Sequence, residues 1–285
     1  MIPRIGFIGL GNIGLPMAQR IAAAGLQPVV CDVVAARVAA AVDAGATAAA
    51  TPAAVAALSD VIGICVRDDA DVVATLTGAQ GVFAAASPGC IVAIHSTVQR
   101  TTVLELGVVA ERHGVELIDA CVAGGAIGAA EGSLTVMVGG NAAAIERARP
   151  MFDCFAKAVV CTGGLGSGCV AKLCNQVMQY VAWEAALEAL QLAQAAGLSV
   201  EAFEAATGAS GALAEPTRRF LGLYKRSPEV RNAPAFQAQL RNFVVIAEKD
   251  LGAALALAQE HGATLPSATA ALPLMARLYG LEEEK

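Results

Sequence analysis

Apolar and polar positions alternate along the first part of the chain in the manner of strands and helices. Short apolar runs bounded by turn residues predict buried strands, and segments with a period near 3.6 predict helices between them. The predicted strands are Ile5–Ile8, Pro28–Cys31, Val61–Val66, Cys90–Ile94, Val115–Ile118, Leu134–Val138 and Ala158–Cys161. The clearest helical segments are the one that follows the first glycines and ends at Ala24, and then Asp69–Leu76, Thr101–His113 and Asn141–Phe155. This alternation predicts a doubly wound, mostly parallel sheet.

The longest helical pattern begins at the glycines near Gly166. Ser167 can cap a helix start and Gly197 can end one, and between them there is no proline and no glycine after Gly168. The segment predicts a helix of about 45 Å, at about 1.5 Å per residue. Because most of its positions are apolar, we expect it to be buried on several sides.

One row of polar residues on this helix stands apart from its apolar background. The members recur at i, i+3, i+4 and i+7 and therefore share a face. They are Lys172, Asn175, Gln176 and Gln179. On its own, the row is also compatible with a solvated stripe on a half-exposed helix.

Beyond Gly163 the pattern predicts helices and no strand. Besides the long helix, they are expected at Val200–Thr207, Thr217–Leu223, Ala235–Glu260 and Ser267–Tyr279. We therefore predict an α/β domain over residues 1–163 and an all-α C-terminal domain over residues 164–285.

Composition and charge narrow the class of protein. The chain is 56% hydrophobic and 15% charged, which excludes disorder and favours a large core or an oligomer interface. The net charge of -6 argues against a nucleic-acid partner. No apolar run predicts a membrane span or a signal peptide, so we expect a cytoplasmic protein. The eight cysteines form no CxxC pair and the three histidines are isolated, which predicts reduced thiols and no metal site.

A glycine motif follows the first predicted strand and leads into a helix. It runs Gly9, Leu10, Gly11, Asn12, Ile13, Gly14. In this context Gly9 makes the tight turn, Gly11 lets a pyrophosphate approach the backbone, and Gly14 lets the helix pack on the sheet. The N-terminus of the helix would hold the phosphates. The motif predicts a dinucleotide-binding Rossmann domain.

Asp32, at the end of the second predicted strand, bears on the choice of dinucleotide. Its carboxylate can accept both ribose hydroxyls and would repel a 2′-phosphate, which favours NAD. Arg37 lies nearby in the sequence and could pair with a phosphate, so NADP remains an alternative.

Ligands of doubly wound sheets bind at the carboxyl ends of the strands. We therefore expect Cys65 and Val66, Ser96 and Thr97, and a loop from Cys121 to Gly128 to face the cofactor crevice. Ser96 and Thr97 are also placed to cap the following helix, and the neighbouring His95 is interpreted as structural.

Four motifs, in this order, resemble those of the β-hydroxyacid dehydrogenases typified by 3-hydroxyisobutyrate dehydrogenase. GLGNIGLPMAQRIAAAG resembles the cofactor signature, and DACVAGGAIGAAEGSLTVMVGG resembles the substrate-loop signature. GSGCVAKLCNQ and EKDLGAALALA resemble the catalytic-helix and C-terminal signatures. The resemblance spans nearly the whole chain. It implies a helical domain for substrate binding and oligomerisation, and a homodimer or homotetramer.

The resemblance also implies roles for single residues. The family's catalytic lysine falls on Lys172, with Asn175 close by, and a lysine beside the cofactor falls on Lys249. Thr97 matches a threonine near the nicotinamide. The expected substrate-binding residues are Ser96, Ala123, Gly124, Gly125 and Gln176. A salt bridge with Glu248 or Asp250 remains the alternative role for Lys249.

Two positions depart from the family pattern. The family usually has a serine where this chain has Ala123, and an asparagine where it has Gln176. That serine holds the substrate carboxylate, so the departures concern the substrate rather than the chemistry. An anionic group held elsewhere could meet Arg218, Arg219 or Lys225, although each could equally be a solvated surface charge.

The implied reaction is hydride transfer between a nicotinamide and a small β-hydroxy acid or its semialdehyde. Lys172 would take the hydroxyl proton in the oxidation and return it in the reduction, because burial in an apolar pocket lowers a lysine pKa towards the useful range. Backbone amides of Gly124 and Gly125 would bind the carboxylate. Two alternatives stay open: an imine reductase on the same scaffold, although such enzymes usually lack the lysine, and a non-catalytic NAD-binding regulatory protein.

Overall fold

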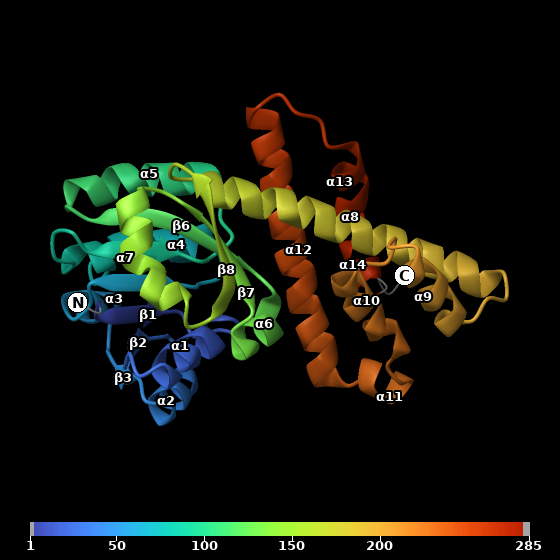
Figure 1. Cartoon of the computed structure of the whole chain (residues 1–285), viewed down its shortest axis with the longest axis horizontal. Coiled ribbons are helices and arrows are strands. Elements are labelled where there is room, and N and C mark those ends of the chain that lie inside the picture. The colour runs from blue at the N-terminus through green and yellow to red at the C-terminus, as the bar shows by residue number, and fades with distance from the viewer. Residues whose placement is uncertain (1–2, 282–285) are drawn as a thin grey trace. The chain divides into compact units, whose positions relative to one another are not determined.

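The computed structural model describes residues 3–281, and the chain forms two compact units, Met1–Lys172 and Leu173–Lys285 (Figure 1). The first unit is built on an eight-stranded sheet in the order β3-β2-β1-β4-β5-β6-β7-β8. Its strands are β1 (Ile5–Ile8), β2 (Val29–Cys31), β3 (Thr47–Ala48), β4 (Val61–Ile64), β5 (Ile91–Ile94), β6 (Glu116–Ala123), β7 (Leu134–Gly139) and β8 (Ala156–Gly163). The strands from β3 to β6 in this order are parallel, β7 runs antiparallel to β6, and β8 is parallel to β7.

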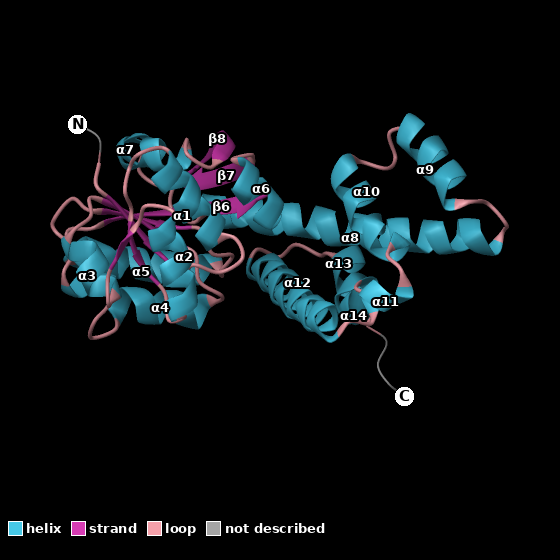
Figure 2. Cartoon of the chain, turned by 90° about the horizontal axis from the view of Figure 1, so that it is seen from below, coloured by secondary structure: helices cyan, strands magenta, loops and turns pink. Residues whose placement is uncertain are grey.

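Helices cover both faces of this sheet (Figure 2). They are α1 (Gly14–Ala23), α2 (Ala35–Asp43), α3 (Pro52–Ala57), α4 (Asp69–Thr77), α5 (Arg100–Arg112), α6 (Gly125–Glu131), α7 (Ala142–Phe152) and the first turn of α8 (Ser167–Ala195), with a short 3-10 turn η1 (Val82–Ala84). One buried apolar cluster includes Met17 of α1 and Phe152 of α7, and a second includes Leu76 of α4 and Leu106 of α5. Strands buried on both faces need continuous apolar runs, which is why β1, β4 and β5 have no polar residue.

The second unit contains no strand within the described residues. After the remainder of α8 come α9 (Val200–Ala209), α10 (Glu215–Leu221), η2 (Gly222–Lys225), α11 (Pro228–Arg231), α12 (Pro234–Glu260), α13 (Pro266–Ala271), η3 (Leu272–Leu274) and α14 (Met275–Leu278). Their apolar faces share one core, which includes Leu187 of α8, Leu251 of α12 and Met275 of α14. The predicted fold class, a Rossmann-like α/β region followed by an all-α region, is confirmed. None of the helices in residues 3–281 is long and apolar enough to cross a membrane.

The strand predicted to end before Asp119 is longer than expected. β6 continues to Ala123, and Gly125–Glu131 forms α6, so the predicted loop from Cys121 to Gly128 is wrong. The strand continues because residues 119–123 pair with β7, from Asp119 opposite Gly139 to Ala123 opposite Thr135.

Three helical expectations also need correction. Ser267–Tyr279 is not one helix, because Pro273 lies in the 3-10 turn η3 that separates α13 from α14. The predicted Thr217–Leu223 helix ends at Leu221 and continues as η2. The long helix is not buried on several sides, since Met178 and Leu192 are 75% and 71% exposed in the single chain.

Candidate active site

The glycine turn between β1 and α1 has the form expected of a phosphate-binding turn. Gly9 has a φ of +90°, and a side chain there would collide with the carbonyl oxygen of Cys65. A side chain at Gly14 would collide with the carbonyl oxygen of Gly9. A Cβ at Gly11 would meet nothing within 4 Å, and no side chain caps the start of α1. An open backbone at a helix N-terminus fits a dinucleotide diphosphate.

Asp32 fixes this turn to the end of β2. Its Oδ2 accepts a hydrogen bond from the Leu10 amide (2.6 Å), and its Oδ1 accepts one from the Val34 amide (2.7 Å). Nη1 of Arg37 lies 3.7 Å from Oδ1. A carboxylate has about four acceptor positions. The two backbone bonds therefore leave acceptor capacity for ribose hydroxyls.

Ser96 joins the ends of β4 and β5. Its buried hydroxyl accepts from the Val66 amide (2.9 Å) and donates to the Val66 carbonyl (2.8 Å). The one hydroxyl proton is therefore already bonded, and Ser96 fixes the Cys65–Val66 segment rather than presenting a donor to a substrate. The residue before α5, Gln99, makes no side-chain cap, and its amide donates to Oδ1 of Asp69 (2.9 Å), so the alternative that Ser96 caps this helix is wrong.

His95 is part of the core beneath this edge of the sheet. Nδ1 lies 2.7 Å from the Ala120 carbonyl oxygen, and the ring stacks on Phe7 with centroids 5.9 Å apart. Burial lowers the pKa of His95 to about 4, so the ring is neutral at pH 7 and donates through Nδ1. The structural interpretation of this histidine is confirmed.

The end of β6 presents backbone to solvent. Ala123 is the last residue of the strand, and Gly124 and Gly125 have φ angles of +127° and +63°, which turn the chain into α6. Both glycines are exposed, and no side chain caps α6. A positive φ is freely available to glycine, so these residues shape the turn through their backbone alone.

Asp119, in the middle of β6, holds the start of α8. The side chain is fully buried, its Oδ1 accepts from the Gly166 amide (2.7 Å), and its Oδ2 accepts from the Cys169 amide (2.7 Å). Burial raises the pKa of Asp119, and the two amide hydrogen bonds oppose that rise. Lys172, one helical turn after Cys169, is buried with 8% exposure. The sequence pattern predicted a strand that ends before Asp119 and gave this residue no role, although a carboxylate flanked by apolar residues already indicates a buried partner.

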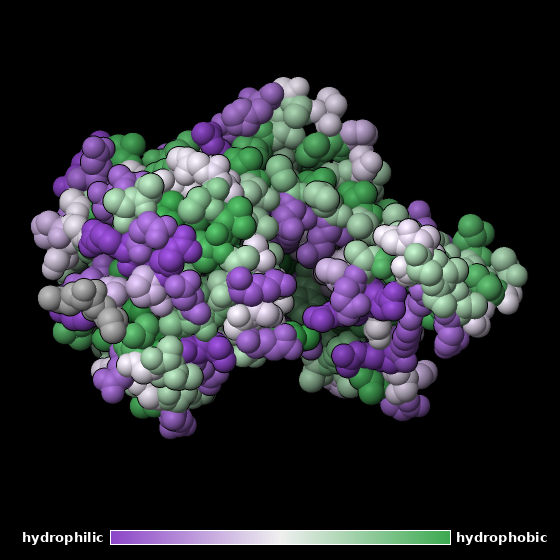
Figure 3. Space-filling model, in the orientation of Figure 1, coloured by the Kyte–Doolittle hydropathy of each residue, from purple (hydrophilic) through white to green (hydrophobic). Residues whose placement is uncertain are grey.

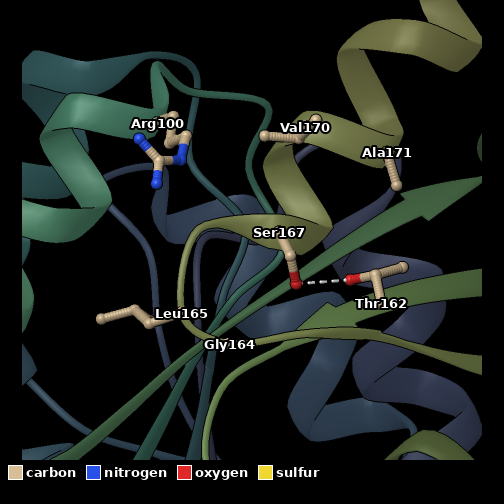
Figure 4. Close-up of a pocket in the computed structure, with 7 residues that line it drawn as sticks. All are labelled: Arg100, Thr162, Gly164, Leu165, Ser167, Val170 and Ala171. Atoms are coloured by element: carbon tan, nitrogen blue, oxygen red, sulfur yellow. Dashed lines mark hydrogen bonds between the residues drawn. The ribbon is translucent and has the colours of Figure 1, made fainter.

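A cavity of about 480 Å³ also lies at the start of α8 (Figure 4). It is lined by Arg100, Thr162, Gly164, Leu165, Ser167, Val170 and Ala171. The hydroxyls of Ser167 and Thr162 are 2.8 Å apart and bond each other. No residue predicted to bind cofactor or substrate lines this cavity, so we assign it no part in the reaction.

In the second unit, Asp250 connects the catalytic-helix and C-terminal motifs. Nε2 of Gln176 donates to Oδ2 of Asp250 (2.6 Å) and to the hydroxyl of Tyr180 (3.3 Å). Nδ2 of Asn175 donates to Oε1 of Gln176 (3.2 Å). Nζ of Lys249 lies 3.0 Å from Oδ1 of Asp250, so the salt bridge considered as an alternative for this lysine is present. Both amide protons of Gln176 are thus already bonded within this unit.

Two of the candidate holders for a displaced anionic group are already paired with acids. Arg219 bonds Glu215 (3.1 Å), and Lys225 bonds Glu204 (2.6 Å). These contacts favour the surface-charge interpretation for both residues.

The comparisons with known proteins match both parts of the chain. Residues 4–164 match the family described as the NAD binding domain of 6-phosphogluconate dehydrogenase. Residues 166–284 match the family described as NAD-binding of NADP-dependent 3-hydroxyisobutyrate dehydrogenase.

Individual relatives agree with these matches. An NAD-dependent L-serine dehydrogenase of Pseudomonas aeruginosa is 34% identical, over 95% of this chain and 90% of that protein. A probable 3-hydroxyisobutyrate dehydrogenase of Mycobacterium tuberculosis is 33% identical, over 96% and 91%. A solved structure of M. tuberculosis 3-hydroxyisobutyrate dehydrogenase with L-serine has a TM-score of 0.81 at 30% identity, over 98% of this chain and 94% of that one. The chain belongs to the 3-hydroxyisobutyrate dehydrogenase-like family of NAD(P)-binding β-hydroxyacid dehydrogenases.

Proposed function

We propose that this protein oxidises a small β-hydroxy acid, or reduces the corresponding semialdehyde, with Lys172 as the proton-transfer group. The observation that carries the proposal is the buried lysine one turn into α8, in the same unit as a glycine turn that is open to a diphosphate. Residues 1–163 would bind the cofactor, and residues 164–285 would serve substrate binding and oligomerisation. L-Serine, the substrate in the name of one relative, is itself a β-hydroxy acid.

NAD, when bound, supplies the hydride acceptor or donor. The turn from Gly9 to Gly14 would hold its diphosphate, and Asp32 would accept from the adenosine ribose hydroxyls. Cys65, Val66 and Thr97 would line the site at the ends of β4 and β5. Preference for NAD over NADP follows from the Asp32 carboxylate, which would repel a 2′-phosphate. Arg37, whose Nη1 lies 3.7 Å from Oδ1 of Asp32, is the group that could pair with a 2′-phosphate, so NADP is the alternative cofactor.

Lys172 moves the proton. In the oxidation, a neutral Nζ accepts the proton of the substrate hydroxyl, and in the reduction the ammonium donates it to the carbonyl oxygen. A position with 8% exposure keeps bulk water from competing for that proton. Three residues of the second unit take their proposed roles from the family resemblance. Asn175 would serve catalysis, Gln176 would bind the substrate and Lys249 would bind the cofactor.

The substrate carboxylate would bind the exposed backbone amides of Gly124 and Gly125. Ala123 has no hydroxyl to add a further bond, and the proton of Ser96 is taken by Val66. We therefore propose a substrate that is bulkier than 3-hydroxyisobutyrate near this turn, or one whose anionic group is held elsewhere.

A homodimer or homotetramer is the proposed assembly. Apolar side chains reach the surface among hydrophilic ones (Figure 3), and two of the most exposed, Met178 and Leu192, lie on α8. Exposed apolar residues on a long helix favour burial against another subunit. Light scattering on the purified protein tests this, and a monomer at all concentrations would contradict it.

The activity is tested by a panel of β-hydroxy acids of increasing size, with NAD and with NADP. L-Serine, 3-hydroxyisobutyrate, larger analogues and the corresponding semialdehydes should include a substrate, and kcat/KM should be higher with NAD. Reduction of cyclic imines without activity on any hydroxy acid would favour the imine reductase alternative. Tight NADH binding without turnover of any compound would favour a regulatory protein.

A further inference from the structure

We infer that Asp119 is a positioning residue for the proposed reaction, because it ties the strand that ends in the substrate turn to the helix that carries Lys172. The inference rests on the proposed function of Lys172. It concerns only residues of the first unit.

Glycines surround the carboxylate of Asp119 where the chain segments pack too closely for side chains. A Cβ at Gly139 would meet Oγ of Ser167 at 2.5 Å and Oδ1 of Asp119 at 2.8 Å. A Cβ at Gly168 would meet the Met137 carbonyl oxygen at 2.5 Å and Oδ2 of Asp119 at 2.9 Å. Gly166, whose amide bonds Oδ1, has a φ of +86°. The glycines of this region therefore let the chain approach one buried carboxylate from β7 and from the start of α8.

The two hydrogen bonds fix the first turn of α8 in position and in rotation. Gly166 directly precedes the helix, and Cys169 is its third residue, so the carboxylate bridges amides on both sides of the helix start. Backbone amides at a helix N-terminus carry partial positive charge, which makes a carboxylate their best acceptor. Residues three apart in a helix lie on one face, so the turn held at Cys169 is the turn that presents Lys172.

The same carboxylate belongs to the strand that leads to the substrate turn. Asp119, Cys121 and Ala123 alternate along β6 and share one face of the sheet. Cys121 makes a second link to the same helical turn, with its Sγ 3.7 Å from the Sγ of Cys169. Asp119 thus sets the distance between the amides proposed to bind the carboxylate and the amine proposed to move the proton. Displacing a reacting group by about 1 Å can cost about 100-fold in rate.

The test is Asp119→Asn, with Asp60→Asn as the matched control. Asparagine keeps the size of the side chain, but it places an NH₂ group against one of the two amide donors. Asp60 also accepts a backbone amide, from Arg4 (2.9 Å), but lies at the surface. Hydrogen exchange over residues 164–172 should be about 10- to 100-fold faster in Asp119→Asn only, as expected when a hydrogen bond to a charged group is lost.

Turnover separates positioning from general support of the fold. With NAD and the best β-hydroxy acid substrate of the panel, Asp119→Asn should lower kcat at least about 10-fold and leave KM for NAD within about twofold. A normal kcat would overturn the inference, and so would a parallel loss of kcat and NAD binding. If Lys172→Ala keeps its turnover, the proposed function fails first. If Lys172→Ala loses turnover while Asp119→Asn keeps it, only the role of Asp119 fails.

A second pair of variants covers the case in which Asp119→Asn does not fold. Cys169→Pro removes the amide donor at a first-turn position where helices tolerate proline, and Cys169→Ala keeps that amide. Faster exchange and lower kcat in the proline variant alone would support the inference. Equal behaviour of the two variants, or misfolding of the proline variant alone, would overturn it in favour of a purely structural carboxylate.

Discussion

At the scale of single residues, Ala123 lies beside the proposed substrate turn at the position where the family resemblance implies a serine. In the proposed site a serine hydroxyl there would donate to the substrate carboxylate, and such a bond contributes about 1.5–3 kcal/mol. We predict that Ala123→Ser raises kcat/KM for the smallest β-hydroxy acids by about 10-fold or more. Steady-state kinetics on L-serine, 3-hydroxyisobutyrate and larger analogues would measure this. If the wild-type protein is already efficient on the smallest acids and the serine adds nothing, the backbone amides suffice.

The buried His95 makes stability depend on pH. Its pKa is about 4 in the folded protein, against an ordinary 6.5, so the unfolded chain binds more protons between these values. The contribution of the neutral histidine to the free energy of unfolding is intact above about pH 6.5 and falls as the pH drops towards 4. The total loss is about 3 kcal/mol, since one pKa unit corresponds to about 1.4 kcal/mol. Asparagine can still donate to the Ala120 carbonyl but does not titrate. The free energy of unfolding, measured with denaturant from pH 7 to pH 4, should therefore depend less on pH for His95→Asn than for the wild type. An identical pH dependence would contradict the low pKa assigned to His95.

Residues in motifs of fixed spacing could be predicted from the sequence, whereas those whose partners lie outside any motif could not. The glycines of the turn and Asp32 belong to one such motif, so the spacing indicates their roles although Asp32 bonds an amide 22 residues away. Asp119 bonds an amide 50 residues away, and Ser96 bonds Val66 at a separation of 30. The spacing of apolar residues describes one helix or strand at a time, so it does not predict such pairs. The one local indication was that apolar residues flank the carboxylate of Asp119 on both sides.

At the scale of elements, the strand–turn–helix unit of β1 and α1 separates two roles of glycine. A Cβ at Gly11 has open space around it, whereas one at Gly14 would collide with the Gly9 carbonyl. Gly11→Ala should therefore leave the melting temperature nearly unchanged and weaken NADH binding at least about 10-fold, since the methyl group occupies the space for the diphosphate. Gly14→Ala should destabilise the protein itself. Calorimetric titration and thermal unfolding measure the two effects, and unchanged NADH affinity in Gly11→Ala would contradict the proposed site.

The ends of helices could be predicted where proline or glycine determines them. The long α8 was predicted because its segment has no proline and no glycine after Gly168. The last predicted helix is interrupted at Pro273, because a proline inside a helix removes a backbone hydrogen bond. The extension of β6 could not be predicted, because it depends on pairing with β7 and on the reversal of direction there. Polar alternation is weak in both strands, so the sequence carries no sign of that reversal.

At the scale of the whole molecule, strands alternating with helices followed by helices alone were sufficient to predict the fold class. The arrangement within the second unit was not accessible in this way. Gln176 and Asp250 lie 74 residues apart on two long helices, and their hydrogen bond depends on how those helices pack. The sequence pattern predicts the apolar face of each helix, but it does not predict which residues of two helices contact each other.

The central claim, that Lys172 moves the proton in β-hydroxy acid oxidation, is tested most directly by Lys172→Ala assayed on the best substrate of the panel with NAD. General acid–base catalysis contributes about 100- to 10,000-fold, so kcat should fall at least about 100-fold. Affinity for NADH should stay within about twofold, because the glycine turn is untouched. Lys157→Ala, at an exposed position of β8, should behave as the wild type. Near-normal turnover by Lys172→Ala would show that another group moves the proton and would contradict the account.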